Sequence, residues 1–266
     1  MSSRPKRLDQ RILLPILVLA SVSLWAQSLP TCTKLSGPGF KVVLDDVRLN
    51  GGEGSASTPQ DEIFMTRLNY MLDTRFHDPR FSAIMMPVRC NRYPNKSLFD
   101  HGALETLNDN NVVLELWGDV LPYRPGTQQA FINYVLVPVR YVEFGSSDRG
   151  IYTVPHSVPS GSGAEELLHL FTQGNELTAY ALVSLGFKQL RNSQFDAAKK
   201  NLTEGQFQLT RVFGRTPDQD QRTLLSYVHE RVCDTVRQAR ADPTYSAKKG
   251  GLTYLSEAEV TKICAP

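Results

Sequence analysis

An almost continuous run of hydrophobic residues, Val112 to Leu121, stands near the middle of the chain and is interrupted only by Glu115, Gly118 and Asp119. A strand with one solvent-exposed face would alternate apolar and polar residues, and this run does not. We therefore predict a central strand over residues 111–121 that is covered on both faces. The flanking segments must then supply the strands that pair with it and the helices that cover it.

The segments on either side of this run have the patterns of strands and amphipathic helices. In chain order they predict a strand, a helix, a strand and a helix before the central strand, and one strand after it: 40–49, 59–77, 81–89, 97–108 and 130–144. Strands that are separated by helices become parallel neighbours, whereas the last two strands form a hairpin. The order β-α-β-α-β-β therefore predicts a small mixed sheet with helices packed on it.

The second half of the chain has a different composition. Residues 145–163 are rich in glycine, serine and proline and follow neither period, so we interpret them as a linker that allows a short strand at 151–154. Helix-forming residues dominate from Ala164 onward, and the helices predicted there cover 165–173, 176–191, 194–213, a segment opened by Pro217, and a short turn at 257–263. The predicted fold class is α+β, with an α/β-type domain over 40–144 followed by a small all-α domain over 164–266.

The amino terminus has the order of residues typical of a secretory leader. Four basic residues within the first eleven positions precede an apolar run over residues 12–26. That run is short for a membrane span, which needs about 20 residues, so we predict a signal peptide over 1–26 that is cleaved after Ala26. Two alternatives stay open, an uncleaved inner-membrane anchor over 12–26 and a lipoprotein acylated at Cys32. The prediction is an exported protein, periplasmic or secreted.

Export makes the cysteines informative, because an even number of them in an oxidising compartment indicates disulfides. The chain has four, Cys32, Cys90, Cys233 and Cys264. Of the three possible connectivities, locality favours Cys32 with Cys90 and Cys233 with Cys264, one bridge in each domain. Four free, buried thiols are the alternative. No pair has the short spacing of a zinc knuckle.

The charge of the chain excludes one large class of partners. The formal net charge is +2, from 29 basic and 27 acidic residues that are scattered along the sequence. This leaves no basic patch of the kind that binds nucleic acid. We expect contact with a membrane only through an uncleaved leader.

One helical hairpin carries a specific series of large and small residues. The series consists of Leu182, Leu185, Gly186, Phe195, Ala198, Leu202 and Gly205. Over residues 182–205 it resembles one tetratricopeptide repeat, in which small residues lie where the two helices cross and large residues fill the groove between them. Gln189 and Thr210 depart from the family pattern, and an ordinary helical hairpin is the alternative. A lone repeat must be completed by the helix over 223–240 or by the α/β domain.

The first domain, over residues 40–144, resembles the amino-terminal domain shared by TolB and by curli-export and flagellar-assembly envelope proteins. The resemblance rests on element order, on the first strand at Val42 to Leu49, and on the hairpin that begins at Val112 to Gly118. It carries no catalytic residue. It implies an exported accessory domain that binds envelope proteins or assembles with copies of itself.

No group of residues predicts catalysis, a cofactor or a metal. The five histidines, His77, His101, His156, His169 and His229, lie far apart without a metal-binding spacing. Glu115 could be a buried acid with a shifted pKa, and its pairing with Arg140 across the hairpin is the simpler interpretation. Asn95 and Asn201 begin matches to the glycosylation sequon.

These observations favour an exported envelope accessory protein that acts as a protein–protein interaction or assembly module. Its expected partners are other envelope proteins or further copies of the chain, and catalysis is not the favoured interpretation. Two alternatives remain: an exported hydrolase with a site at the carboxyl ends of the strands, near Arg89, Asn91 and Asp119, and a small-ligand sensor in a cleft between the domains.

Overall fold

The structure is a computed structural model that describes residues 35, 37–49, 57–90, 107–138, 151–246, 251–252 and 255–265. Several predictions concern residues outside these ranges. They are the leader at 1–26, Cys32, Asn91, Asn95, His101, Arg140 and most of the helix at 97–108.

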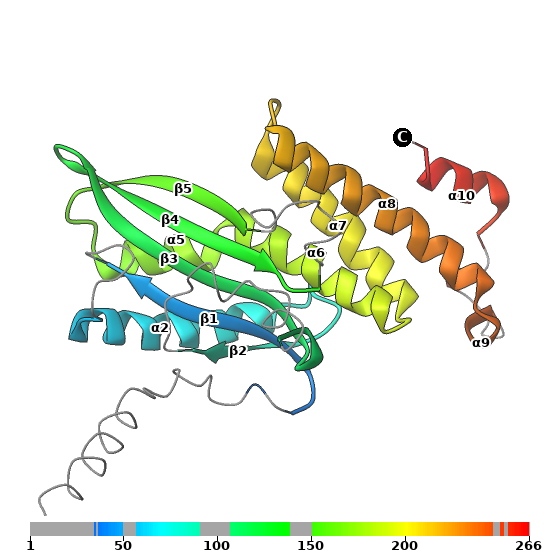
Figure 1. The fold of residues 1–266 in the computed structure, drawn as a ribbon, viewed down its shortest axis with the longest axis horizontal. Helices are drawn as coiled ribbons and strands as arrows, with labels where there is room; N and C mark the ends of the chain where they lie inside the picture. The colour runs from blue at the N-terminus through cyan, green and yellow to red at the C-terminus, as the bar shows by residue number, and fades with distance from the viewer. Residues whose placement is uncertain are drawn as a thin grey trace, which may run out of the picture. The chain divides into compact units, whose positions relative to one another are not determined.

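Among the described residues, five strands form one mixed sheet (Figure 1). The strands are β1 (Phe40–Arg48), β2 (Met85–Arg89), β3 (Val112–Arg124), β4 (Thr127–Leu136) and β5 (Ile151–Pro159), in the spatial order β2-β1-β3-β4-β5. β1 runs parallel to β2 and β3, whereas β3, β4 and β5 are antiparallel neighbours. The predicted mixed sheet is therefore confirmed.

β3 is the middle strand of this sheet. Its residues Val112, Val113, Leu114 and Leu116 are all 0% exposed. The prediction of a central strand that is covered on both faces is confirmed. The strand is longer than predicted and reaches Arg124, because β4 continues the antiparallel pairing down to the turn.

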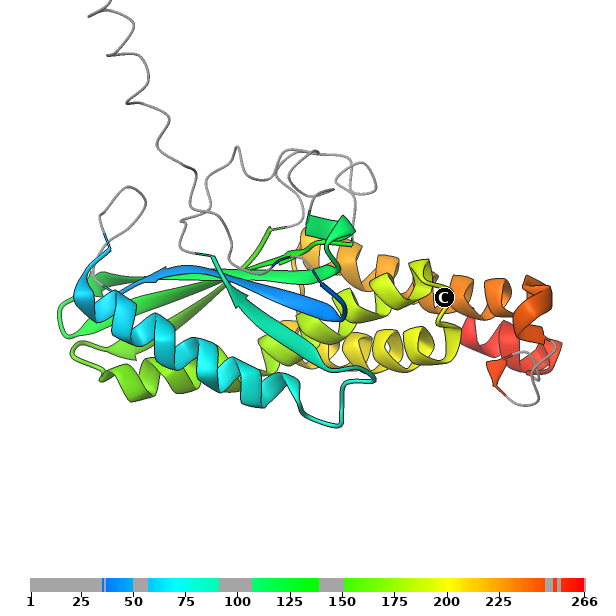
Figure 2. The same ribbon diagram turned by 90° about the horizontal axis from the view of Figure 1, so that it is seen from below.

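Three helices, α2 (Pro59–Phe76), α5 (Ala164–Gln173) and α6 (Asn175–Arg191), contribute to the core on one side of the sheet (Figure 2). α2 begins at a capping box in which Thr58 and Asp61 each accept a backbone N–H from the other. The Asp61 carboxylate also accepts the N–H of Leu49 at 3.0 Å. This hydrogen bond connects the start of α2 to the end of β1.

The segment predicted as a linker at 145–163, with a short strand at 151–154, forms a longer strand, β5, and the turn into α5 over its described residues. β5 pairs with β4 along its whole length, from Ile151 to Pro159. Its sequence looks like a loop because it contains two prolines. In the structure, most of its side chains are not buried. Such features are typical of a strand at the end of a sheet, which has only one neighbour.

Both end strands of the described sheet carry proline where a free N–H would point outward. Ser160 donates its N–H to the carbonyl of Gly126, and backbone N–H groups alternate in direction along a strand. The even-numbered residues of β5 therefore direct their N–H groups towards β4, whereas the odd-numbered ones, including Pro155 and Pro159, direct their backbone nitrogens away from it. Cys90 donates to Leu44 at the end of β2, which places Pro87 at an outward position by the same alternation. Proline lacks the N–H, so each edge offers fewer donors to another strand.

Replacing Pro155 with threonine is expected to promote self-association, because it restores an outward donor to β5. Sedimentation velocity at increasing protein concentration should show larger species than the wild type forms. Ser157→Thr is the control, since Ser157 occupies another odd-numbered position of the same strand and already has its N–H. If P155T sediments as the wild type does, the proline does not protect this edge.

The sheet and the carboxyl-terminal helices share one hydrophobic core. Every residue of α6 from Leu177 to Gln189 is buried. The ring of Tyr180 stacks on the rings of Tyr134 of β4 and Tyr152 of β5, with centroid distances of 4.7 Å and 5.2 Å. Burial raises the pKa of Tyr180 well above its usual value, so its hydroxyl stays neutral. The helical region therefore packs as part of the sheet's core and is not joined to it through a linker.

The helical hairpin consists of α6 and α7 (Phe195–Phe213), and α8 (Gln219–Ala241) packs beside α7 (Figure 1). The two glycines of the series lie where the helices approach each other most closely. A Cβ atom on Gly186 would lie 2.7 Å from Leu202, and one on Gly205 would lie 2.6 Å from Val183. The other members of the series, Leu182, Leu185, Phe195, Ala198 and Leu202, are all buried.

Two short helices, α9 (Pro243–Ser246) and α10 (Glu257–Ile263), follow α8. A disulfide joins Cys233 of α8 to Cys264, directly after α10. No residue of α10 is fully buried, but Val260 and Ile263 pack against the hydrophobic cluster that contains Val236 and Ala239 of α8. The disulfide and the Arg240–Glu257 ion pair, at 2.5 Å, add to this attachment. Cys90 is buried and disulfide-bonded, and the predicted partner Cys32 lies outside the described residues. In the described part of the chain, none of the helices has the combination of length and hydrophobicity that a membrane span requires.

Candidate functional site

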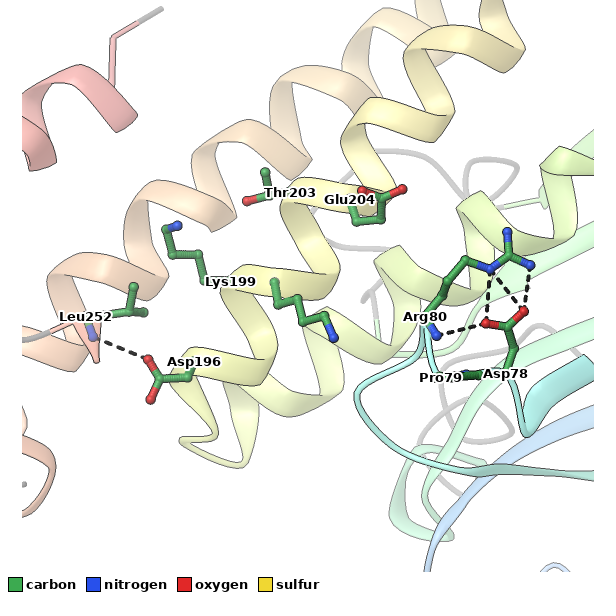
Figure 3. A pocket seen from close by; sticks show the side chains of 9 residues that line it. Asp78, Pro79, Arg80, Asp196, Lys199, Thr203, Glu204 and Leu252 are labelled. Atoms are coloured by element: carbon green, nitrogen blue, oxygen red, sulfur yellow. Dashed lines mark hydrogen bonds and ion pairs between the residues drawn. The ribbon is translucent and has the colours of Figure 1, made fainter. Parts of the chain in front are cut away.

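A cleft of about 860 Å³ lies between one side of α7 and the turn that follows α2 (Figure 3). It is lined by Asp78, Pro79, Arg80, Asp196, Lys199, Lys200, Thr203, Glu204 and Leu252. Asp78 to Arg80 lie just beyond the carboxyl end of α2, and five of the other six residues come from successive turns of α7. The cleft therefore forms only when α2 and α7 are held by the common core.

The three acidic side chains of the cleft all have partners within the protein. Asp78 accepts hydrogen bonds from the guanidinium of Arg80 at 2.7 to 3.1 Å, as Figure 3 shows. Asp196 accepts the N–H of Leu252 at 3.3 Å. Glu204 accepts a hydrogen bond from Gln208 at 2.7 Å. These contacts hold the acidic groups in place and leave them less available to a ligand.

The two lysines differ from the acids in this respect. Lys199 is partly buried and Lys200 is exposed, and neither has a hydrogen bond or an ion pair with any described residue. The Thr203 hydroxyl, on the same side of α7, has no hydrogen-bond partner among them either. The cleft thus presents two ammonium groups and one hydroxyl that can donate to a ligand.

The hydrogen bonds from Arg80 hold the pKa of Asp78 at about 2, below its usual range. Because the folded-state pKa is lower than the unfolded-state pKa, the stabilisation is complete above about pH 4 and is lost as the pH falls towards 2. In Arg80→Ala the pKa should return towards about 4, which NMR of the carboxyl carbon can measure. Arg67→Ala should leave it unchanged, because Arg67 pairs with Glu165. An unchanged pKa in R80A would show that Arg80 is not the cause.

The residues proposed for a hydrolase site do not converge. Arg89 pairs with Glu62 at 2.5 Å, and its backbone lies opposite Leu44 of β1. Asp119 lies on the other side of β1, opposite Arg48 and four positions further along that strand. Asn91 is outside the described residues. The described part of the sheet therefore brings together no pair from this set.

Glu115 is fully buried in β3, where it lies in register with Val43 on one side and with Val135 on the other. Since Arg140 lies outside the described residues, the predicted Glu115–Arg140 pair stays a prediction.

The described histidines are distributed over separate elements. His77 follows α2, His156 lies in β5, His169 in α5 and His229 in α8. Within the described ranges, no cluster of three or more histidine, cysteine, aspartate or glutamate side chains could hold a metal ion.

The sequon at Asn201 does not lie on an accessible surface. Asn201 is 0% exposed, and its amide donates to Ser82 at 2.7 Å and to Gln189 at 2.8 Å. Gln189 also donates to Ser82, at 2.7 Å. This network, which is buried at Asn201 and Gln189 and reaches the exposed Ser82, ties the segment after α2 to α6 and α7. In the folded protein the burial of Asn201 excludes a glycan there. One member of this network was noticeable in the sequence, because the polar residue Gln189 stands where the tetratricopeptide pattern has tyrosine.

No family model matches the sequence, and no curated protein matches it. A solved structure of a point variant of PelC from Paraburkholderia phytofirmans, described as a dodecamer, is similar over 56% of this chain and 93% of that chain, with 18% sequence identity and a TM-score of 0.27. A likeness at this level establishes neither a function nor an assembly state for this protein.

Proposed function

We propose that the chain is an exported envelope accessory protein that acts as a protein–protein interaction or assembly module, and that the outer face of α7 is its contact surface. The observation that carries this proposal is the exposed Phe207, whose side chain is 56% accessible. Phe207 is four residues beyond Thr203 and seven beyond Lys200, so it continues the cleft side of α7. The α7 face is defined as Lys200, Thr203, Phe207 and Arg211.

The composition of the α7 face resembles that of protein interfaces. The guanidinium of Arg211 lies over the ring of Phe207, 5.7 Å from its centre. Aromatic and arginine side chains are enriched in interfaces and account for a large part of their binding energy.

The chemistry of the cleft supports binding more than catalysis. Thr203 supplies the one hydroxyl among the described residues that line it, and none of those residues places a base within hydrogen-bond distance of that hydroxyl. A hydroxyl that acts as a nucleophile is commonly activated by such a base.

Export is supported by two independent features. The order of basic and apolar residues at 1–26 is typical of a leader. The Cys233–Cys264 disulfide fits an oxidising compartment, where such bonds persist. The resemblances to a tetratricopeptide repeat and to the TolB type of domain are also consistent with an accessory role that depends on binding.

The experiment is site-specific photo-crosslinking in the native host. A benzophenone amino acid replaces Phe207 in one variant and Glu230, which is not buried on α8, in the control. We expect a discrete adduct from position 207 and none from position 230, and mass spectrometry will show whether it contains another protein or a second copy of the chain. The proposal fails if the two positions give the same adducts or if position 207 gives none.

A further inference from the structure

We propose that the cleft beside α7 binds a short acidic peptide segment of a partner protein, with Lys199 and Lys200 as the groups that bind its carboxylates. This inference rests on the proposed function and names the chemistry of the partner. The combination of satisfied acids and unpartnered lysines within a single cleft carries it.

The charges within the cleft are not equivalent. Asp78 accepts hydrogen bonds from the cationic Arg80, whereas Asp196 and Glu204 accept theirs from uncharged donors, the Leu252 N–H and the Gln208 amide. Arg80 is engaged by Asp78, and Glu204 lies close enough to raise the pKa of Arg80 further. Lys199 and Lys200 are thus the cations among the described cleft residues that remain available to a ligand. Charge-assisted hydrogen bonds from ammonium to carboxylate are among the strong contacts in an interface.

The length of the cleft suits a peptide. Asp196 and Glu204 are eight residues apart on α7, which corresponds to about 12 Å along a helix axis. An extended chain advances about 3.3 Å per residue, so about four residues of a peptide would span the cleft. Alternate side chains of such a peptide would point to the same side, where two carboxylates could meet the two lysines.

The cleft also offers apolar contacts for the rest of such a segment. Pro79 and Leu252 line its two sides, as Figure 3 shows. Phe207 lies beyond Thr203 on the same side of the helix and could contact an apolar residue that flanks the acidic ones. An acidic segment with interspersed aliphatic residues would match both the charges and these apolar surfaces.

The test uses the full chain and a fluorescent hexapeptide of alternating aspartate and leucine, with the asparagine–leucine peptide as the neutral counterpart. Fluorescence anisotropy measures binding at low ionic strength and again at about 0.3 M salt, where screening is stronger. We expect the acidic peptide to bind and the neutral one to bind at least about tenfold more weakly. The double variant Lys199→Gln/Lys200→Gln should weaken binding of the acidic peptide by at least about tenfold.

The matched control is Arg215→Gln/Lys262→Gln, which removes two exposed positive charges outside the cleft lining. It should bind as the wild type does. Equal weakening by both double variants would overturn the proposal, because net charge and not the cleft would then explain binding. Tighter, lysine-dependent binding of a single-stranded oligonucleotide would overturn it in favour of a phosphate ligand. The proposal is also overturned if no peptide binds and K199Q/K200Q loses a self-association that the wild type shows, because the cleft would then bind a second copy of the chain.

The two proposals fail separately. A crosslink at position 207 together with no peptide binding would keep the α7 face as a contact surface and remove the acidic segment. Peptide binding without a crosslink at 207 would keep the cleft and remove the wider surface.

Discussion

Replacing Tyr180 with alanine is expected to lower the free energy of unfolding by about 3 to 5 kcal/mol, the range for removing a large buried aromatic side chain. The ring stacks on both Tyr134 and Tyr152, so its loss leaves a cavity at the junction of α6 with β4 and β5. Urea unfolding followed by far-ultraviolet circular dichroism reports on the helices. Fluorescence of Trp117, which is buried in β3, reports on the sheet. Both transitions should shift together.

Tyr180→Phe is the control for this experiment. It keeps the aromatic stack and removes only the hydroxyl, so we expect a change within about 1 kcal/mol. If the circular dichroism transition of Y180A shifts while the Trp117 transition does not, the helices and the sheet unfold independently and the common core is wrong.

Replacing Gly205 with alanine is the second change with a large expected effect. The added Cβ atom would lie 2.6 Å from a Val183 methyl group and 3.0 Å from the Val183 backbone nitrogen, and the backbone atom cannot move without displacing α6. Overpacking of this kind costs about 1 to 3 kcal/mol, and we expect the upper end of that range because backbone is involved. Thermal and urea unfolding measure the loss.

A second substitution tests the cause. Val183→Ala removes the methyl group that G205A would strike, so the double variant should lose less stability than the sum of the two single variants, by about 1 kcal/mol. Strict additivity would mean that the contact between Gly205 and Val183 does not limit the approach of α6 and α7.

The mixed sheet and its central strand could be predicted from the sequence because their signals are local. The apolar run in β3 does not alternate, and the helix start at Thr58 and Pro59 has a capping residue, a proline and acidic residues in their preferred places. The small residues Gly186 and Gly205 indicated a close helix crossing for the same reason, since only small residues permit it. Each prediction needed a few neighbouring residues and no knowledge of distant contacts.

The role of β5 and of α6 in the common core could not be predicted in this way. Tyr152 is a single aromatic residue in a segment rich in proline and glycine, and its partner Tyr180 lies in a helix whose sequence is equally suitable for an independent bundle. The cleft was missed because its two sides, Asp78 to Arg80 and Asp196 to Glu204, are more than a hundred residues apart in the sequence. Only the packing of α6 and α7 on the core brings them together.

Because the cleft depends on the packing of α6 and α7 on the core, binding cannot be tested by deleting the helices. α6 supplies part of the cover of β3 and β4, so deleting the helical half would expose the sheet and unfold it. Loss of a partner after such a deletion would say nothing about the α7 face. Point substitutions on the surface of α7 avoid this problem because Lys200, Thr203 and Phe207 are exposed.

Native-state hydrogen exchange across a range of low urea concentrations tests the common core most directly. The amides of α6 around Tyr180 and those of β3 around Leu116 should open with the same free energy and the same dependence on urea. Earlier opening of α6 to α8, while β3 stays protected, would contradict the account, because the helices would then fold as a separate unit.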